Sequence, residues 1–140
     1  PLPTQDDTLD ESLPEPHNHA EGWQGRFRRG HPDAVLLRYA LACCPELSGL
    51  LISHLDVFER GITLKWCERY QTTEKLNAGT LGHLEHQERL TRLLQTSAPN
   101  YREAPICSET AFRDQLASLT SLPVILTSHG NTAEHVRGAF

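Results

Sequence analysis

The 140-residue sequence predicts one α/β domain, in which a small sheet is flanked by helices. Short apolar runs next to Gly or Pro are typical of strands, and longer segments with leucines at helical spacing are typical of helices. A composition of 38% hydrophobic and 22% charged residues is that of an ordinary globular domain. These observations together favour a sheet-and-helix architecture, and the elements follow in chain order.

The first half of the domain is predicted to hold one helix and two strands. Asp33 is a favoured N-cap residue before the apolar run 34–44, and Pro45 follows it, so this run predicts a helix. Residues 50–58 are short and mostly apolar, which predicts a strand buried on both faces. Residues 62–67 alternate in polarity, which predicts a second, more exposed strand.

The second half is predicted to hold two helices and a strand. The leucines in 81–95 share one helical face, and 99–105 reads as irregular. Residues 109–122 predict a third helix, and 123–127 predict a third strand. The resulting order is α-β-β-α-α-β. The core side of the third helix is expected to carry Phe112, Leu116 and Leu119.

Residues 1–21 are rich in proline and acidic side chains, so we expect a flexible lead-in before a domain at 22–140. They contain no apolar stretch typical of a signal peptide, and no stretch of the chain is long enough to span a bilayer, which makes the cytoplasm the expected location. The four cysteines form no C-x-x-C motif, so buried reduced thiols are expected. The pairs His17/His19 and His83/His86 are too few ligands, and we predict no metal site.

The charge balance bears on possible partners. The formal net charge is −5, which argues against binding to a nucleic-acid backbone. Eleven of the 13 basic residues are arginines, and three of them, Arg26, Arg28 and Arg29, lie between Gly25 and Gly30. Planar guanidinium groups suit phosphate or carboxylate ligands, so this loop is a candidate anion site. A solvated basic loop that answers the acidic lead-in is an equally good interpretation.

The expected exits of two strands provide a second candidate site. In α/β sheets, ligands gather beyond the carboxyl ends of strands, and here those ends are 54–56 and 128–130. The carboxylate of Asp56 is able to accept two parallel N–H bonds, which guanine offers and adenine does not. Ser128 adds a hydroxyl, and Gly130 leaves room for a flat base.

Two other interpretations of these residues remain open. Spacing alone favours the interpretation that Asp56 merely caps a turn before Phe58. A Ser-His-Asp hydrolase is a further alternative, built from Ser128, Asp56 and either His54 or His129. The chain contains no G-x-S-x-G elbow, so we disfavour the hydrolase. It also lacks a Walker-type loop, and therefore a phosphate cradle of its own.

Five segments follow one another along the chain: GRFRR at 25–29, DAVLLRYA at 33–40, LISHLDVF at 51–58, LKWCERY at 64–70 and PVILTSHG at 123–130. In order and spacing over residues 22–137, they resemble the C-terminal region of adenylosuccinate synthetases. The family pattern is a G-R-P-R-R loop, a D-x-V-x-L-R-Y-A segment, a K-L-D-V-L strand, a strand ending C-x-x-Y, and a final P-V-x-x-I-S-T-G.

The resemblance implies part of a cytoplasmic, GTP-dependent ligase of purine biosynthesis, which joins aspartate to inosine monophosphate. It implies that Gly25 and Arg26 contact the substrates, and that Arg28 serves GTP and the transition state as a catalytic residue. The Mg²⁺ of the complete enzyme would lie outside this chain, and a homodimer is a possible assembly. The positions that match the family's GTP-binding residues are His54, Leu55, Asp56, Ser128, His129 and Gly130.

The chain also departs from the family pattern. Trp23 and Gln24 stand where the family has two threonines, His54 replaces a lysine, and His129 replaces a threonine. The family's N-terminal part, with its phosphate loop and catalytic Asp and His, is absent from this sequence. The chain alone is therefore expected to be inactive and to need that part as a partner. The alternative is a nucleotide-binding or interaction domain of a paralogue that has lost or changed the ligase reaction.

Overall fold

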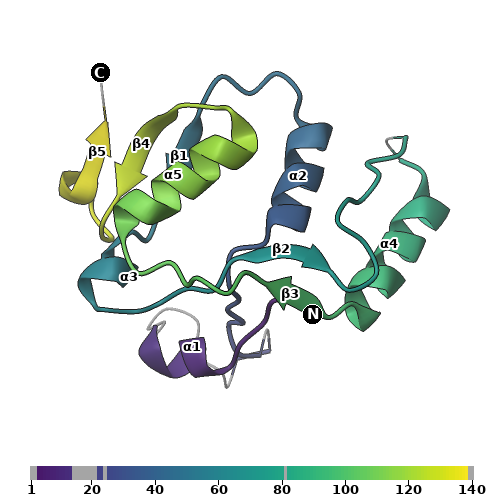
Figure 1. Cartoon of the computed structure of the whole chain (residues 1–140), viewed down its shortest axis with the longest axis horizontal. Coiled ribbons are helices and arrows are strands. Elements are labelled where there is room, and N and C mark those ends of the chain that lie inside the picture. The colour runs from purple at the N-terminus through teal and green to yellow at the C-terminus, as the bar shows by residue number, and fades with distance from the viewer. Residues whose placement is uncertain (1–2, 14–21, 24, 81, 139–140) are drawn as a thin grey trace.

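The fold is α/β, with two small sheets and helices packed against them (Figure 1). In the three-stranded sheet, β4 (Val124–Ser128) is central. It pairs in parallel with β1 (Leu50–Ile52) and antiparallel with β5 (Val136–Gly138). The computed structural model describes residues 3–13, 22–23, 25–80 and 82–138.

The second sheet is an antiparallel pair, β2 (Cys67–Tyr70) with β3 (Pro99–Tyr101). Between these two strands the chain forms α4 (Leu84–Thr96), which lies at the end of the molecule away from the three-stranded sheet (Figure 1). The predicted helix of 81–95 is thus confirmed with a later start. Residues 99–105, expected to be irregular, contain β3 instead. This strand is stabilised by backbone pairing with β2, which the local sequence does not indicate.

Two predicted helices are confirmed, the first of them together with its predicted cap. In α2 (Ala34–Cys43), the Asp33 carboxylate accepts hydrogen bonds from the Val35 N–H at 2.9 Å and the Leu36 N–H at 3.1 Å. The same carboxylate accepts the Tyr70 hydroxyl at 2.6 Å, which ties α2 to β2. The second confirmed helix, α5 (Glu109–Thr120), is capped by Ser108.

The apolar core forms two clusters. The larger one surrounds Leu55 and Trp66, and α5 packs against it through Phe112, Leu116 and Leu119, as expected from the sequence. The smaller cluster lies between α2, β2 and α4. Its buried members are Val35, Cys67, Tyr70 and Leu76.

The first predicted strand is wrong beyond Ile52. His54 has φ +63°, a left-handed conformation that ends the extended backbone, and residues Asp56–Glu59 form the short helix α3. Leu51 is 63% exposed, so β1 is not buried on both faces. Asp56 therefore lies in the first turn of a helix, four residues past the strand.

The second predicted strand is displaced toward the C-terminus. Residues 62–66 make one isolated bridge, Leu64 to Ile106, and regular pairing begins at Cys67. The thiol prediction is also wrong in part, since Cys43, Cys44 and Cys107 are exposed and only Cys67 is buried. None of the four is in a disulfide.

Residues 3–13 of the expected flexible lead-in pack on the rest of the chain. Leu9, in α1 (Thr8–Ser12), is 5% exposed, and Thr4 is 2% exposed. The Thr4 hydroxyl donates to the His31 carbonyl oxygen at 2.8 Å. Thr4 and Leu9 are thus buried, although the proline-rich, acidic composition of this segment gives no indication that it packs on the rest of the chain. Residues 14–21, with His17 and His19, lie outside the described residues, as does Gln24.

No helix in the described ranges is both long and apolar enough to cross a membrane. Among the same residues, no group of three or more His, Cys, Asp or Glu side chains has an arrangement that would hold a metal ion.

Candidate functional site

A cavity of about 710 Å³ lies between α1, the arginine loop, the start of α2 and α3. Its walls are mainly apolar and include Trp66 and Leu116 from the core. The charged residues on the same lining are Arg28 and Arg29 from the loop, Asp33 at the start of α2, Asp56 in α3 and Arg60 directly after it. The fold thus brings two separately predicted candidates, Arg28 and Asp56, to one cavity.

The Asp56 carboxylate is partly exposed and bonded to a side chain. Its Oδ2 accepts from Arg60 Nη2 at 2.6 Å, one helical turn later, and its side chain is 20% exposed. Asp56 makes no side-chain hydrogen bond to a backbone N–H of the described residues. Leu55, and not Asp56, is the N-cap residue of α3. The interpretation of Asp56 as a mere turn cap is therefore wrong.

His54 and Leu55 line the cavity and lie next to the end of β4 at Ser128. His54 Nδ1 lies 2.9 Å from the Ser53 hydroxyl. Leu55 is 1% exposed, and its backbone N–H donates to the Ser128 carbonyl oxygen at 3.0 Å. That bond holds the two predicted strand exits side by side.

The side chains of 128–130 do not line this cavity. The Ser128 hydroxyl donates to the Gly130 carbonyl oxygen at 2.9 Å. A Cβ added at Gly130 would lie 2.4 Å from His135 Nδ1, so the His135 ring already occupies the space that we expected a flat base to use. A contact of these residues with GTP stays a prediction.

His129 is a core residue beneath this loop. Its side chain is 4% exposed, with Nε2 3.2 Å from the Thr127 hydroxyl. Its Nδ1 has no hydrogen-bond partner in the described chain and lies 3.7 Å from Glu109 Oε2. Because the Ser128 hydroxyl is bonded to a carbonyl rather than to a histidine, the hydrolase alternative has no support in the geometry.

The three loop arginines have different surroundings. Arg26 Nη2 lies 2.7 Å from Asp7 Oδ1, and Arg29 Nη1 lies 3.3 Å from Asp10 Oδ1. Arg28 has no ion pair with any residue in the described ranges, and it lines the cavity, whereas Arg26 does not. Arg26 and Arg29 thus answer the acidic lead-in, but only Arg26 is also well exposed, since the Arg29 side chain is 14% exposed. Arg28 is available to a ligand.

Gly25 begins this loop in a left-handed conformation with φ +69°, and a Cβ there would meet nothing within 4 Å. The glycine therefore serves the backbone turn that directs the arginines, because the φ value favours a residue without a side chain.

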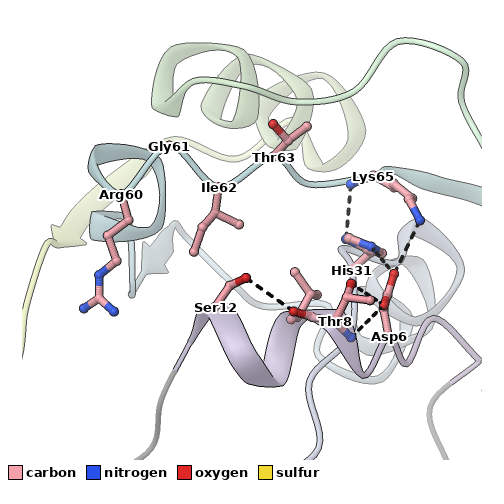
Figure 2. Close-up of a pocket in the computed structure, with 10 residues that line it drawn as sticks. Asp6, Thr8, Ser12, His31, Arg60, Gly61, Ile62, Thr63 and Lys65 are labelled. Carbon is pink, nitrogen blue, oxygen red and sulfur yellow. Dashed lines mark hydrogen bonds and ion pairs between the residues drawn. The ribbon is translucent and has the colours of Figure 1, made fainter.

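A smaller cavity of about 580 Å³ lies between α1 and the segment 60–65 (Figure 2). The Lys65 N–H donates to His31 Nδ1 at 3.2 Å, so Nε2 carries the imidazole proton and donates to Asp6 Oδ2 at 3.1 Å. Burial lowers the pKa of His31, and hydrogen bonds from Thr8 hold the pKa of Asp6 far below its usual value. Arg60 lies at the opposite end of this cavity from Lys65 and lines both cavities (Figure 2).

Sequence reasoning missed three members of this region. Arg60 follows Asp56 by four residues, a spacing at which opposite charges on a helix pair, and this signal was available once α3 was recognised. The packing of His31 against Asp6 had no local signal, because it joins residues 25 apart.

No protein-family model matches the sequence, and no curated protein matches it. A solved structure described as fully ligated adenylosuccinate synthetase from Plasmodium falciparum is similar to this chain, with a TM-score of 0.65 and 16% sequence identity. The similarity covers 100% of this chain and 36% of that one. This chain thus spans about a third of the length of that synthetase. Its small mixed sheets and helices form an α/β fold that resembles part of adenylosuccinate synthetase.

Proposed function

We propose that this chain is the guanine-nucleotide-holding portion of an adenylosuccinate synthetase-type ligase, which uses GTP to join aspartate to inosine monophosphate. The observation that carries the proposal is that Asp56 and Arg28 line one cavity of about 710 Å³. The likeness of the fold to part of such a synthetase supports it.

The chemistry of the cavity suits a guanine nucleotide. A carboxylate accepts the N1–H and the exocyclic amino group of guanine, while adenine presents an acceptor at N1. The apolar walls suit the faces of a flat base. A guanidinium without an internal partner suits a phosphate, and Arg28 would stabilise negative charge on a transferring phosphoryl group.

Catalysis would need groups beyond those described. The resemblance assigns the phosphate loop, the general base and bound Mg²⁺ to another part of the synthetase, so we expect this chain to bind nucleotide without turnover.

An exposed face of the three-stranded sheet supports the proposal that another part of the protein packs there. Its inner face is covered by α5, but Leu51 and Ile125 on the chain's parallel strand pair are 63% and 47% exposed. Parallel strands in α/β proteins are ordinarily covered on both faces.

One observation favours a second candidate, a nucleotide-binding domain that has lost the ligase reaction. Arg26, the residue expected to contact the substrates, is instead paired with Asp7 at 2.7 Å and with Asp10 at 3.3 Å. Trp23, which stands where the family has a threonine, is 97% exposed. In this candidate, guanine recognition persists and substrate recognition does not.

Calorimetric titration of the chain with GTP, ATP and inosine monophosphate tests the proposal. We expect GTP to bind more tightly than ATP, and Asp56→Asn to weaken GTP binding by about 1–3 kcal/mol, because an acceptor becomes a donor that faces N–H groups. Asp114→Asn, which alters an exposed carboxylate on α5, is the matched control. Equal binding of GTP and ATP would contradict guanine recognition.

The same titrations separate the two candidates. The ligase candidate requires inosine monophosphate to bind and Arg26→Ala to abolish that binding. The second candidate requires GTP binding alone, with no measurable affinity for inosine monophosphate.

A further inference from the structure

The side chains of Asp56 and Arg60 form one polar unit on the wall of the larger cavity. We propose that Arg60 is a specificity-determining residue, which donates a hydrogen bond to O6 of a guanine whose N1–H and amino group are accepted by Asp56. The inference rests on the proposed function of this cavity and adds to it the residue that reads the third group on the base edge.

The geometry places a donor beside an acceptor. Arg60 Nη2 is 2.6 Å from Asp56 Oδ2, and both residues line the cavity. The Arg60 guanidinium donates to no other side chain or carbonyl of the described residues, and Asp56 Oδ1 accepts from none of them. The pair therefore keeps unused guanidinium N–H groups next to an unused carboxylate oxygen. The Arg60 side chain is 49% exposed, so those N–H groups are accessible to a ligand.

This order of groups complements guanine. The Watson–Crick edge of guanine presents an acceptor at O6, then donors at N1 and the amino group. The Arg60 guanidinium followed by the Asp56 carboxylate presents a donor and then acceptors, which is the complementary order of groups. Adenine would bring its 6-amino donor against the guanidinium and its N1 acceptor against the carboxylate, so both contacts would be unfavourable. Mismatched polar groups of this kind give larger discrimination than a lost apolar contact.

The backbone fixes the pair in position. Val57, on the same short helix, is 8% exposed and packs in the larger core cluster, which anchors α3. Gly61 follows Arg60 with φ +72° and ends the helix, so Arg60 occupies the last position before the chain turns toward β2. The i,i+4 spacing then brings the guanidinium to Asp56.

A competing arrangement makes the opposite prediction. If Arg60 only masks Asp56, its removal would expose both carboxylate oxygens and raise the affinity for guanine nucleotides. If Arg60 contacts O6, its removal would lower that affinity and reduce discrimination at position 6 of the base. The sign of the change therefore decides between the two.

The experiment compares GTP with 6-thio-GTP, whose sulfur is a weak acceptor but whose N1–H and amino group are retained. Dissociation constants are measured for the full chain, for Arg60→Leu and for Arg60→Lys. Wild type is expected to bind GTP about tenfold more tightly than 6-thio-GTP, because one charge-assisted hydrogen bond is lost. In Arg60→Leu, GTP affinity is expected to fall about tenfold and the ratio to approach one. Arg60→Lys is expected to keep part of the preference.

Arg92→Leu is the matched control, because Arg92 is in another exposed i,i+4 pair, with Glu88 on α4. It is expected to leave both affinities unchanged. Tighter GTP binding by Arg60→Leu, or an unchanged ratio, would overturn the role of Arg60 while leaving guanine binding intact. Wild-type protein that binds GTP no better than ATP would overturn the proposed function itself. Circular dichroism of each variant checks that α3 and the sheets are retained.

Discussion

The Arg26 guanidinium lies 2.7 Å from the Asp7 carboxylate, so the first arginine of the loop forms an ion pair with a side chain of the amino-terminal segment. The hydrogen bond from Arg26 lowers the pKa of Asp7, which keeps it charged. The segment reaches further, because Leu9 and Leu13 form part of the wall of the larger cavity. The amino-terminal segment is thus a structural part of the candidate site, and it leaves Arg28 as the loop arginine without an ion pair in the described chain.

Asp7→Asn is expected to free Arg26 for ligands. If Arg26 serves the substrate as proposed, this variant will bind inosine monophosphate more tightly than wild type, because the nearer of the two carboxylates that pair with Arg26 is neutralised and only Asp10 remains. Little change in thermal stability is expected, because exposed ion pairs contribute little. Calorimetry gives the affinity, and Glu11→Gln, an exposed position on α1, is the control. Unchanged affinity in Asp7→Asn would mean that Arg26 has only a structural role.

Leu9→Ala is expected to destabilise the fold by about 2–4 kcal/mol, because a large buried side chain is lost and a cavity remains. Leu9 is 5% exposed, whereas Leu84 on α4 is 80% exposed. Leu84→Ala is therefore the matched control, with an expected change within about 0.5 kcal/mol. Urea denaturation measures both. Similar values for the two variants would show that α1 does not pack in solution as described.

The sequence predicted best where structure is determined locally. The helices α2 and α5 have a capping side chain, Asp33 or Ser108, directly before an amphipathic run, and both begin where those caps lie. The strand over 50–58 failed because its end depends on the left-handed backbone of His54, which apolar composition does not encode. Strand β3 was not foreseen because its partner β2 is distant in the sequence, whereas β5 was missed although it pairs with the preceding strand β4.

The candidate site shows the same division. Arg28 and Asp56 were recognised one by one from residue chemistry, but their shared cavity depends on tertiary packing. The covering of Gly130 by His135 depends on the turn before β5 and had no local signal. The interpretation of the arginine loop as an answer to the acidic lead-in needed only charge complementarity, and it held for Arg26.

Stability is expected to fall with pH below neutrality because of His31 and Asp6. The pKa of His31 is lower in the fold than its ordinary 6.5, chiefly through burial, so folding favours neutral imidazole. Its contribution is fully present above pH 6.5 and is lost as the pH falls toward the folded pKa. The pKa of Asp6 is also lowered, so its contribution is present above 3.8 and is lost at more acidic pH.

Urea denaturation between pH 8 and pH 5 measures this dependence. The free energy of unfolding of wild type should decline over that interval more steeply than that of His31→Gln, which has no titrating group at this position. The difference between the two curves isolates His31 from the other histidines. Parallel curves for wild type and variant would contradict the assignment.

His135→Ala is expected to uncover Gly130, because the His135 ring occupies the space beside its Cα. If the 128–130 loop contacts guanine, as the resemblance implies, the variant should bind GTP several-fold more tightly than wild type, since a flat base gains access to the loop. His83→Ala is the matched control, because His83 also accepts a backbone hydrogen bond at the start of a helix, α4, but is not one of the side chains beside Gly130. GTP affinity that rises in both variants would reflect general loosening of the fold. An unchanged affinity in His135→Ala would confine base recognition to the wall formed by Asp56, and the loop would then have to be assigned to packing alone.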